Sequence, residues 1–478
     1  MLTRFKVSGF KNLVDVDVRF GPFTCIAGPN GVGKSNLFDA IRFLGALADK
    51  SLLEAALSVR SEGGAGGDPR AIFFRVGERT TPTMSFEAEM IVPREGVDDL
   101  GQPAKAAITF LRYGLDLELQ KGEIKIRRES LDYISQSTAK GELKFPHSAA
   151  WRRSAIAGKR SAPFISTEGG QVRLHTDMGE GYKGGGRPRP YVADRLPRTV
   201  LSDANAADSA TTVLARREMQ SWRILQLEPS ALRTSDPYLA LRSIASNGAH
   251  VPATLARLAG IVPGGGPRTI KDPDAVFAQV ANRLSQLIDG VRSVRIEADD
   301  RRELLTLILT DETGTEHEAR ALSDGTLRFI ALGVLETDPE ATGVLCFEEP
   351  ENGIHPERIP AMRDLLEDIA VDPDLPIGED NPLRQVIVNS HSPAVIEEVA
   401  PDDLLMATTR YVHGAQGPSR RPDFRAVEGT WRSKAGETAV PLATIHALLD
   451  PMRRRRNVEP KKPRVLDFRD PEQLLLLS

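Results

Sequence analysis

The stretch "GPNGVGKS", residues 28–35, decides the fold of this 478-residue chain. The short apolar segment "FTCIA" (23–27) precedes it and predicts a buried strand. Apolar residues at helical spacing follow it and predict a helix; they are Leu37, Ala40, Ile41, Leu44, Leu47 and Ala48. A glycine-rich turn between a strand and a helix presents backbone N–H groups and the positive helix end to anions. The sequence therefore predicts an α/β core with a phosphate-binding turn.

These eight residues match the P-loop pattern G-x-x-x-x-G-K-[ST] in full. We expect Lys34 to reach the β- and γ-phosphates of a nucleotide, and the Ser35 hydroxyl to ligate Mg²⁺. A chance glycine-rich turn is the alternative, and the flanking strand and helix argue against it. The other P-loop residues predicted to bind the nucleotide are Asn30, Gly31, Gly33 and Asn36.

A second stretch, "VLCFEEPENGIHP" (344–356), places Glu348 and Glu349 at the end of an apolar strand, with Glu351 close behind. Two like charges at the end of a buried strand need a positive partner, and Mg²⁺ together with Lys34 would supply it. A P-loop site needs one carboxylate to hold Mg²⁺ and often a second to orient the attacking water. We therefore assign Glu348 to Mg²⁺ and Glu349 to catalysis. A solvated acidic loop after an edge strand is the alternative.

Two further segments carry polar residues at the ends of predicted elements. "LSDGTLRFIALGVL" (322–335) opens a helix that Ser323 would cap, and an exposed helix N-terminus binds anions. An ordinary capped helix would look the same. "QVIVNSHSP" (385–393) is an apolar strand that ends at His391, where a histidine could contact the γ-phosphate. A lone histidine is usually structural, but its order after the other motifs favours a functional role.

The order P-loop, Ser-Asp-Gly helix, Glu-Glu strand and strand-His resembles the ABC-type ATPase family. In that family the element similar to "LSDGT" is the signature motif, which acts on the nucleotide held by the partner in a head-to-head dimer. The resemblance implies that Ser323 and Gly325 close on the partner's γ-phosphate and that His391 is the switch histidine. It also implies a Walker B strand running into a D-loop at "FEEPENGIHP", ATP and Mg²⁺ as ligands, ATP hydrolysis, and a homodimer or higher homo-oligomer.

Within that superfamily the chain resembles the RecF/SMC/OLD-like branch of stand-alone bacterial AAA-type ATPases. The opening "FKVSGFKNL" (5–13) and the wording of "EEPENGIHP" and "NSHSP" carry this resemblance. Lys34 and Ser323 lie 289 residues apart (323 minus 34), which is long for a transporter subunit and short for an SMC protein with its coiled-coil arm. Glutamate at 348 replaces the usual aspartate. No glutamine precedes Gln102, so a Q-loop glutamine cannot be placed between the P-loop and the first hairpins, and Arg60 or Arg70 is the candidate substitute.

We expect an α/β fold of the ABC-type P-loop ATPase head, with a mixed sheet, an antiparallel β subdomain and a partly helical insertion. The alternating patterns in 84–130 and 304–322 predict antiparallel hairpins, residues 135–215 look loop-rich, and residues 216–290 look helical. The expected domains are the N-terminal half of the head with the P-loop and hairpins (1–134), the loop-rich and helical insertion (135–290), the C-terminal half with signature, Walker B, D-loop and switch histidine (291–415), and a C-terminal extension with a basic run (416–478).

Composition narrows the possible functions. The net charge is only −4, so any contact with DNA must use a local basic patch. The basic segments "KGGGRPRP" (183–190) and "RRRRNVEPKK" (453–462) could bind phosphates or be solvated loops. Two cysteines in apolar runs fit a reducing compartment. Because no signal peptide and no apolar run of about 18 residues are found, we expect a cytoplasmic protein without a membrane segment.

These features suggest an ATPase that dimerises on ATP and couples this to DNA binding or to control of a separate effector. The effector would be a nuclease, in genome maintenance or anti-phage defence. A built-in Toprim nuclease is not expected, because the 85 residues after Pro393 (478 minus 393) contain no Asp-x-Asp pair. The alternatives are the nucleotide-binding subunit of an ABC transporter and an ATP-controlled protein scaffold without DNA. The long insertion and the missing Q-loop glutamine count against the transporter.

Overall fold

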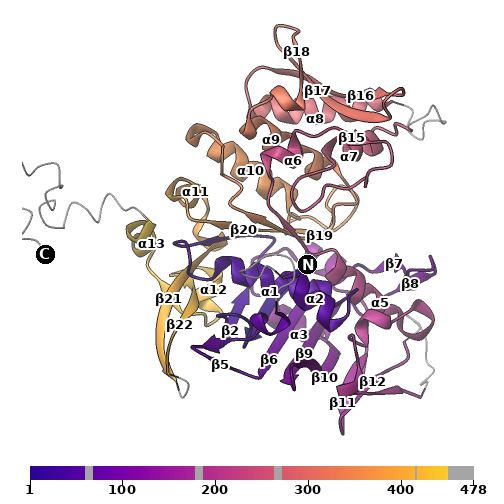
Figure 1. Cartoon of the computed structure of the whole chain (residues 1–478), viewed down its shortest axis with the longest axis vertical. Coiled ribbons are helices and arrows are strands. Elements are labelled where there is room, and N and C mark those ends of the chain that lie inside the picture. Colours follow the sequence, from indigo (N-terminus) through magenta and orange to yellow (C-terminus); the bar gives the residue numbers. More distant parts are fainter. Residues whose placement is uncertain (60–67, 178–186, 263–271, 415–416, 450–478) are drawn as a thin grey trace, which may run out of the picture.

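The computed structural model describes residues 1–59, 68–177, 187–262, 272–414 and 417–449. Two lobes are visible in Figure 1. The lower lobe holds the two large sheets, and the upper lobe holds a small sheet with helices packed on it.

A mostly parallel sheet forms the centre of the lower lobe. Its first five strands run parallel, and the sixth turns back antiparallel to the fifth. Ligands of open parallel sheets bind at the carboxyl ends of the strands, which here carry the predicted motifs. Among the described residues its strand order is β14 (Arg223–Leu225), β19 (Gly343–Glu348), β20 (Arg384–Ser390), β3 (Phe23–Ala27), β21 (Leu404–Gly414), β22 (Gly417–Val427) and β23 (Ala439–Val440).

The second large sheet is antiparallel throughout its described strands. Buried and half-buried residues alternate over residues 3–8 of β1, which is the period expected of a sheet with one buried face. Its strand order is β13 (Arg189–Val192), β12 (Gln171–Leu174), β11 (Ile165–Glu168), β10 (Glu123–Tyr133), β9 (Phe110–Gln120), β6 (Thr83–Ile91), β1 (Leu2–Ser8) and β2 (Val16–Arg19).

Helix α1 (Lys34–Ala46) shares one core with both sheets. The Phe43 ring of α1 lies 5.6 Å from the rings of Phe10 and Phe86, centroid to centroid. A buried glutamine also ties the sheets together: Gln385 of β20 donates to Leu2 O at 2.8 Å and accepts from Leu2 N at 2.8 Å. Because α1 packs on both large sheets and Gln385 bonds those sheets to each other, the position of the helix after the P-loop is fixed by both.

The upper lobe is a small antiparallel sheet packed on helices (Figure 1). Helix α9, which the sequence predicts as the signature helix, connects this lobe to the parallel sheet through contacts with its neighbours α8 and α10. The elements of this lobe are β15 (Asp236–Pro237), β16 (Val291–Asp299), β17 (Leu304–Asp311), β18 (Glu316–Glu318), α6 (Pro229–Leu232), α7 (Val251–Leu258), α8 (Pro273–Leu287), α9 (Asp324–Thr337) and α10 (Ile359–Ile369).

Further helices and four short strands belong to the described part of the chain. They are α2 (Leu52–Ser58), α3 (Gln136–Glu142), α4 (Ala149–Ala155), α5 (Ala206–Gln220), α11 (Pro393–Glu398), α12 (Trp431–Lys434), α13 (Leu442–Leu449), and the short strands β4 (Arg75–Val76), β5 (Arg79–Thr80), β7 (Glu95–Val97) and β8 (Pro103–Lys105).

The predicted fold class is confirmed: a mixed α/β protein with a second, antiparallel sheet. The strand before the P-loop spans Phe23–Ala27 as predicted, and the helix after it begins at Lys34. The hairpin predicted at 304–322 is the pair β17 and β18. Within the described residues, no helix is long and apolar enough to cross a membrane.

Two expectations about the middle of the chain need correction. Residues 135–215 are not simply loop-rich, because β11, β12 and β13 extend the antiparallel sheet and α5 spans Ala206–Gln220. Residues 216–290 are not only helical, because β14 joins the parallel sheet beside β19. The segment 135–290 thus contributes strands to both large sheets, and the four domain boundaries remain predictions. The basic run 453–462, most of the predicted loop 61–69 and half of "KGGGRPRP" lie outside the described residues.

Candidate active site

Two of the predicted motifs, the P-loop and the Glu-Glu strand end, meet around one hollow of about 500 Å³ at the carboxyl ends of β3, β14, β19 and β20. The P-loop, the Glu-Glu strand end and the loop after β14 all contribute to its wall. The described residues that line it are Asn30, Gly31, Gly33, Lys34, Ser35, Asn36, Gln226, Leu227, Glu228, Pro229, Arg328, Glu348, Glu349, Asn352 and Asn389.

The P-loop adopts a backbone that requires glycine at Gly33. Its φ is +115°, and a Cβ there would lie 3.1 Å from Asn12 Nδ2 and from the Pro422 side chain. Asn36, two residues into α1, donates to Asn12 Oδ1 at 2.8 Å. The loop is therefore held against the segment that follows β1.

Lys34 is 6% exposed and points back along the loop. Its Nζ donates to Gly28 O at 2.5 Å and to Pro29 O at 3.0 Å. Burial lowers the pKa of Lys34, and the nearby carboxylates of Glu349 and Glu351 oppose that shift. A buried ammonium bonded to neutral carbonyls is a ready partner for an incoming phosphate.

Glu348 ends β19 and is buried, whereas Glu349 begins the next turn with φ +45°. Register pairs Glu348 with Asn389 of β20. The Glu349 N–H donates to the Asn389 carbonyl and to its Oδ1, each at 3.1 Å. The unusual turn at Glu349 is thus fixed by the neighbouring strand.

The Glu349 carboxylate is held at both oxygens. One oxygen lies 2.8 Å from His391 Nδ1, and the other accepts from Asn352 Nδ2 at 3.0 Å. His391 does not line the hollow itself but contacts it through Glu349. The structure therefore brings together Lys34, Ser35, Glu348 and Glu349, with His391 behind them.

The predicted signature residues lie elsewhere. Ser323 caps α9, accepts from Thr326 N at 3.2 Å, and is exposed. Neither Ser323 nor Gly325 is among the described residues that line the hollow. Gly325 instead packs on the turn after Glu349, where an added Cβ would lie 3.2 Å from Gly353 O.

The lining suits a magnesium ion bound with a nucleotide. Mg²⁺ prefers oxygen ligands and shares its coordination with substrate phosphates. Ser35 offers a hydroxyl and Glu348 a buried carboxylate in the same hollow. Among the described lining residues, three carboxylates (the third is Glu228) face two cations, so an added cation would balance their charge.

Sequence reasoning missed several lining residues, and Gln226 is the most informative. It directly follows β14, the strand beside the Glu-Glu strand β19. Arg328 on α9, Asn352 and Asn389 were also missed as lining residues. The only sequence signal is the apolar pair Ile224 and Leu225 before the glutamine. Two apolar residues do not mark a strand within the stretch 216–290, whose pattern predicts helices.

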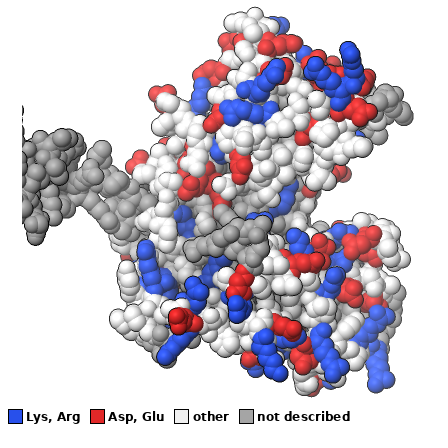
Figure 2. Space-filling model, viewed as in Figure 1, with Lys and Arg blue, Asp and Glu red and all other residues white. Residues whose placement is uncertain are grey.

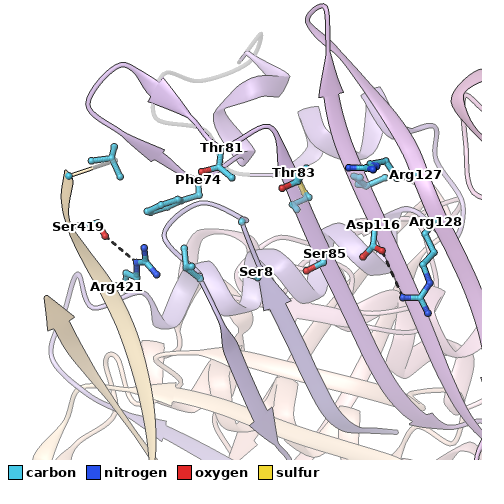
Figure 3. A pocket seen from close by; sticks show the side chains of 16 residues that line it. Ser8, Phe74, Thr81, Thr83, Ser85, Asp116, Arg127, Arg128, Ser419 and Arg421 are labelled. Carbon is cyan, nitrogen blue, oxygen red and sulfur yellow. Dashed lines mark hydrogen bonds and ion pairs between the residues drawn. The ribbon is translucent and has the colours of Figure 1, made fainter. Parts of the chain in front are cut away.

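Two other hollows lie outside this site. The first, about 1020 Å³, shares Ser35 and Asn36 with it and contains Arg70, which is paired with Asp68 at 2.7 Å. Arg60 lies outside the described residues. The second, about 690 Å³, lies over the antiparallel sheet, where Arg421 stacks on Phe74 at 5.4 Å (Figure 3). None of the described residues that line it is a predicted site residue.

Comparison with known proteins agrees with the motifs. Residues 23–101 and 206–397 match the family described as "AAA domain, putative AbiEii toxin, Type IV TA system". Because the match covers more than half of the chain, the protein belongs to this family of AAA domains. The resemblance to AAA-type P-loop ATPases is therefore confirmed at the level of the family. No match was found among curated proteins.

Solved structures of SMC head domains are distantly similar to the chain. The SMC head bound to the C-terminal winged-helix domain of ScpA shares 14% identity, with 89% of this chain and 98% of that chain covered and a TM-score of 0.46. The SMC head of Thermotoga maritima shares 12% identity, with coverage of 88% and 98% and a TM-score of 0.36. The ScpA-bound SMC head of Pyrococcus furiosus shares 12%, with coverage of 88% and 96% and a TM-score of 0.43.

Proposed function

We propose that this protein binds and hydrolyses Mg-ATP in the hollow beside the P-loop. The observation that carries the proposal is the meeting of Lys34, Ser35, Glu348 and Glu349 around one hollow, with His391 bonded to Glu349. A phosphate cradle, a metal-binding carboxylate and an oriented second carboxylate are the parts that phosphoryl transfer to water requires.

Each residue has a role that its geometry supports. The P-loop amides and Lys34 bind the phosphates, and Lys34 exchanges its two carbonyl acceptors for phosphate oxygens. Ser35 and Glu348 hold Mg²⁺, which neutralises phosphate charge when bound. Glu349 orients and polarises the attacking water, and His391 senses the γ-phosphate while fixing the Glu349 carboxylate. Asn30, Gly31, Gly33 and Asn36 complete the nucleotide cradle.

We assign Gln226 as the Q-loop glutamine, for which the motif pattern in the sequence offers no candidate. It lies in the hollow at the end of β14, next to the strand that carries Glu348. In the resembled family a glutamine in the Q-loop contacts the nucleotide site, and Gln226 supplies that group here. Arg70 is then not needed as a substitute, and its pairing with Asp68 agrees with this.

Dimerisation is part of the proposal. Ser323 and Gly325 lie at an open helix end outside the hollow of their own subunit. That position suits action on the nucleotide of a second copy, as in the head-to-head dimers of the resembled ABC-type ATPases. ATP bound between two subunits would then close the dimer, and hydrolysis would open it.

We further propose that this cycle controls DNA binding or a separate effector such as a nuclease, in genome maintenance or defence against phage. The support is the motif resemblance to the RecF/SMC/OLD-like branch. On the face drawn in Figure 2, basic and acidic side chains are interspersed over both lobes, so a DNA contact there would be local. The transporter-subunit and scaffold alternatives predict no response to DNA.

Steady-state ATP hydrolysis by the purified chain, with and without linear double-stranded DNA, tests both the proposed ATP site and the proposed link to DNA. We expect hydrolysis that Lys34→Ala abolishes through loss of ATP binding, and several-fold stimulation by DNA. Wild-type hydrolysis that persists in Lys34→Ala would overturn the ATP site. A hydrolysis rate that DNA does not change would overturn the proposed link to DNA and favour control by a protein partner.

A further inference from the structure

One cation in the hollow makes no hydrogen bond or ion pair with the part of the chain that the structure describes. Arg328, on α9, lines the hollow and is 7% exposed. Its Nε is buried without a hydrogen-bond acceptor. Among the described residues, no hydrogen bond or ion pair to the Arg328 side chain is found.

An unpaired Nε is not special to Arg328, because the Nε of Arg216 and of Arg384 also lacks an acceptor. The other buried arginines of the described chain differ from Arg328 in that their guanidinium groups make hydrogen bonds through other nitrogens. Arg216 donates to Ser202 O at 2.9 Å and to Asp99 at 2.7 Å. Arg384 donates to Leu335 O at 2.8 Å, and Arg432 donates to Arg19 O at 3.0 Å. Each of these three guanidinium groups is used to hold backbone or a carboxylate in place. Arg328 is also buried, but its guanidinium group makes no hydrogen bond or ion pair with any described residue.

Two carboxylates act on Arg328 only through their charge, without a hydrogen bond or ion pair to it. Asp324 and Glu351 are the carboxylates whose charges influence it, and burial is the larger effect, lowering the pKa of the Arg328 guanidinium. Asp324 is bonded to Arg233, and Glu351 accepts from Ser390 Oγ at 2.5 Å. A guanidinium stays charged in proteins, and burying it unpaired is costly, so an anion should enter the hollow to meet it.

We propose, building on the ATP site proposed above, that Arg328 binds a phosphate group of the nucleotide held by its own subunit. Guanidinium forms two parallel hydrogen bonds to phosphate oxygens, which suits a fixed, water-poor site. Arg328 would then bind the phosphates from helix α9, and Lys34 would bind them from the P-loop.

The contact also positions α9. Ser323 caps the same helix about one and a half turns before Arg328, and the helix is continuous between them. A phosphate that anchors Arg328 would therefore fix the helix end that presents Ser323 to the second copy. Each subunit's own nucleotide would in this way prepare its signature motif for the partner's nucleotide.

The test is made in a Glu349→Gln parent, which should bind ATP without hydrolysing it. Mg-ATP affinity is measured by calorimetry, thermal stability without nucleotide by unfolding, and dimer formation by light scattering at saturating ATP. The variants are Arg328→Met, Arg328→Lys, and Arg384→Met as a matched control that removes a buried arginine with carbonyl acceptors.

We expect Arg328→Met to weaken ATP binding by about tenfold or more and to reduce dimer formation at saturating ATP. Its melting temperature without nucleotide should equal or exceed that of the parent, because no partner is lost. Arg328→Lys should recover part of the affinity, since it keeps the charge but not the paired donors. Arg384→Met should lower the melting temperature, because it leaves buried carbonyls unpaired.

The outcomes separate this inference from the proposed function. ATP affinity unchanged in Arg328→Met, or a melting temperature lowered as in Arg384→Met, would overturn the phosphate contact alone. Normal dimer formation at saturating ATP would overturn the positioning of α9. A parent that binds no ATP would overturn the proposed function together with this inference.

Discussion

Glu349 has a backbone conformation that glutamate rarely adopts. Its φ of +45° lies in the left-handed region, which costs a non-glycine residue about 1 kcal/mol or more. Asn389 holds the backbone, and His391 and Asn352 hold the carboxylate. So many contacts on one strained residue indicate that the direction of its carboxylate matters to function.

The first prediction concerns this carboxylate. Glu349→Gln should reduce ATP hydrolysis by about 100-fold or more while ATP binding persists, because an amide cannot polarise water as a carboxylate does. Hydrolysis and binding are measured on the same preparation, and light scattering should show an ATP-bound dimer. Wild-type hydrolysis by the variant would refute the assignment.

A second prediction at the scale of a residue concerns pH. Both carboxylate oxygens of Glu437 are buried, and neither has a hydrogen-bond partner among the residues that the structure describes. Burial raises the pKa of Glu437 to about 7, against the opposing charges of Arg432 and Arg19. Below pH 4.5 the group is neutral in both folded and unfolded chains and costs nothing. As the pH rises towards 7 the unfolded chain ionises more readily, so the folded state loses stability.

Glu437→Gln removes this loss. The variant should gain on the order of 1 kcal/mol of unfolding free energy over wild type at pH 8 compared with pH 5. Chemical denaturation at the two pH values measures the difference, and Glu428→Gln, at an exposed position, controls for the change of net charge. A gap between Glu437→Gln and wild type that is the same at both pH values would contradict the burial argument.

Much of the site could be predicted residue by residue from sequence, because the P-loop and the Glu-Glu strand end have fixed spacing. Gln226 and Arg328 could not. Arg328 falls on the buried stripe of α9, where an apolar residue is the ordinary expectation, and only its missing partners in three dimensions mark it. Gln226 depends on β14, whose three residues are too few to give a period.

At the scale of elements, the N-terminus of α9 is fixed by an ion pair. Arg233, just after α6, lies 2.5 Å from Asp324 and also donates to Leu322 O at 3.1 Å. The aspartate of the proposed signature Ser-Asp-Gly therefore has a local partner on the segment after α6. The pair is about one-third to one-half exposed, so it should add at most about 1 kcal/mol to stability.

The third prediction follows from this pair. Arg233→Met should leave the melting temperature and ATP affinity nearly unchanged but weaken ATP-dependent dimer formation, because the helix end that carries Ser323 loses its anchor. Light scattering of the Glu349→Gln parent with and without Arg233→Met measures the effect. Arg320→Met, which removes a more exposed pair with Glu318 nearby, is the control and should change nothing. Dimer formation by the Arg233→Met variant equal to that of the Arg320→Met control would refute the role of the Arg233–Asp324 pair.

Elements with a clear period were the ones predicted correctly. The apolar run of β3 and the helical spacing of α1 agree with the structure to within a residue or two. Strands β11 to β13 were missed because they are four residues long and half polar at the sheet edge. Their structure comes from pairing with β10 and with one another, which a sequence window does not contain.

At the scale of the whole molecule, the P-loop strand has no sequence neighbour beside it. The strands that flank β3 are β20 and β21, both from the C-terminal half of the chain. The first strand, β1, is bonded to Gln385 of β20 as well. The N-terminal half therefore lacks the partners that bury its own central strand.

The fourth prediction is that residues 1–134 do not fold alone. We expect this fragment to aggregate or to lack a cooperative unfolding transition, because β3 would expose unpaired backbone on both edges. Circular dichroism and limited proteolysis test it, with the full chain as the control. A fragment with a protease-resistant core and a cooperative transition would show that the first 134 residues are an independent domain after all.

The same strand order has a consequence for protein synthesis. The P-loop leaves the ribosome early, but the chain reaches β20 only at Arg384 and β21 only at Leu404. A nascent chain therefore exposes the apolar strand β3 and the P-loop until residue 384 and beyond have been made. During that time it lacks β20, which forms part of the wall of the nucleotide pocket. At the proposed site, nucleotide would bind only once β19 and β20 have emerged, so ATP would stabilise the chain only from that point. Before it, the N-terminal strands would be exposed to aggregation.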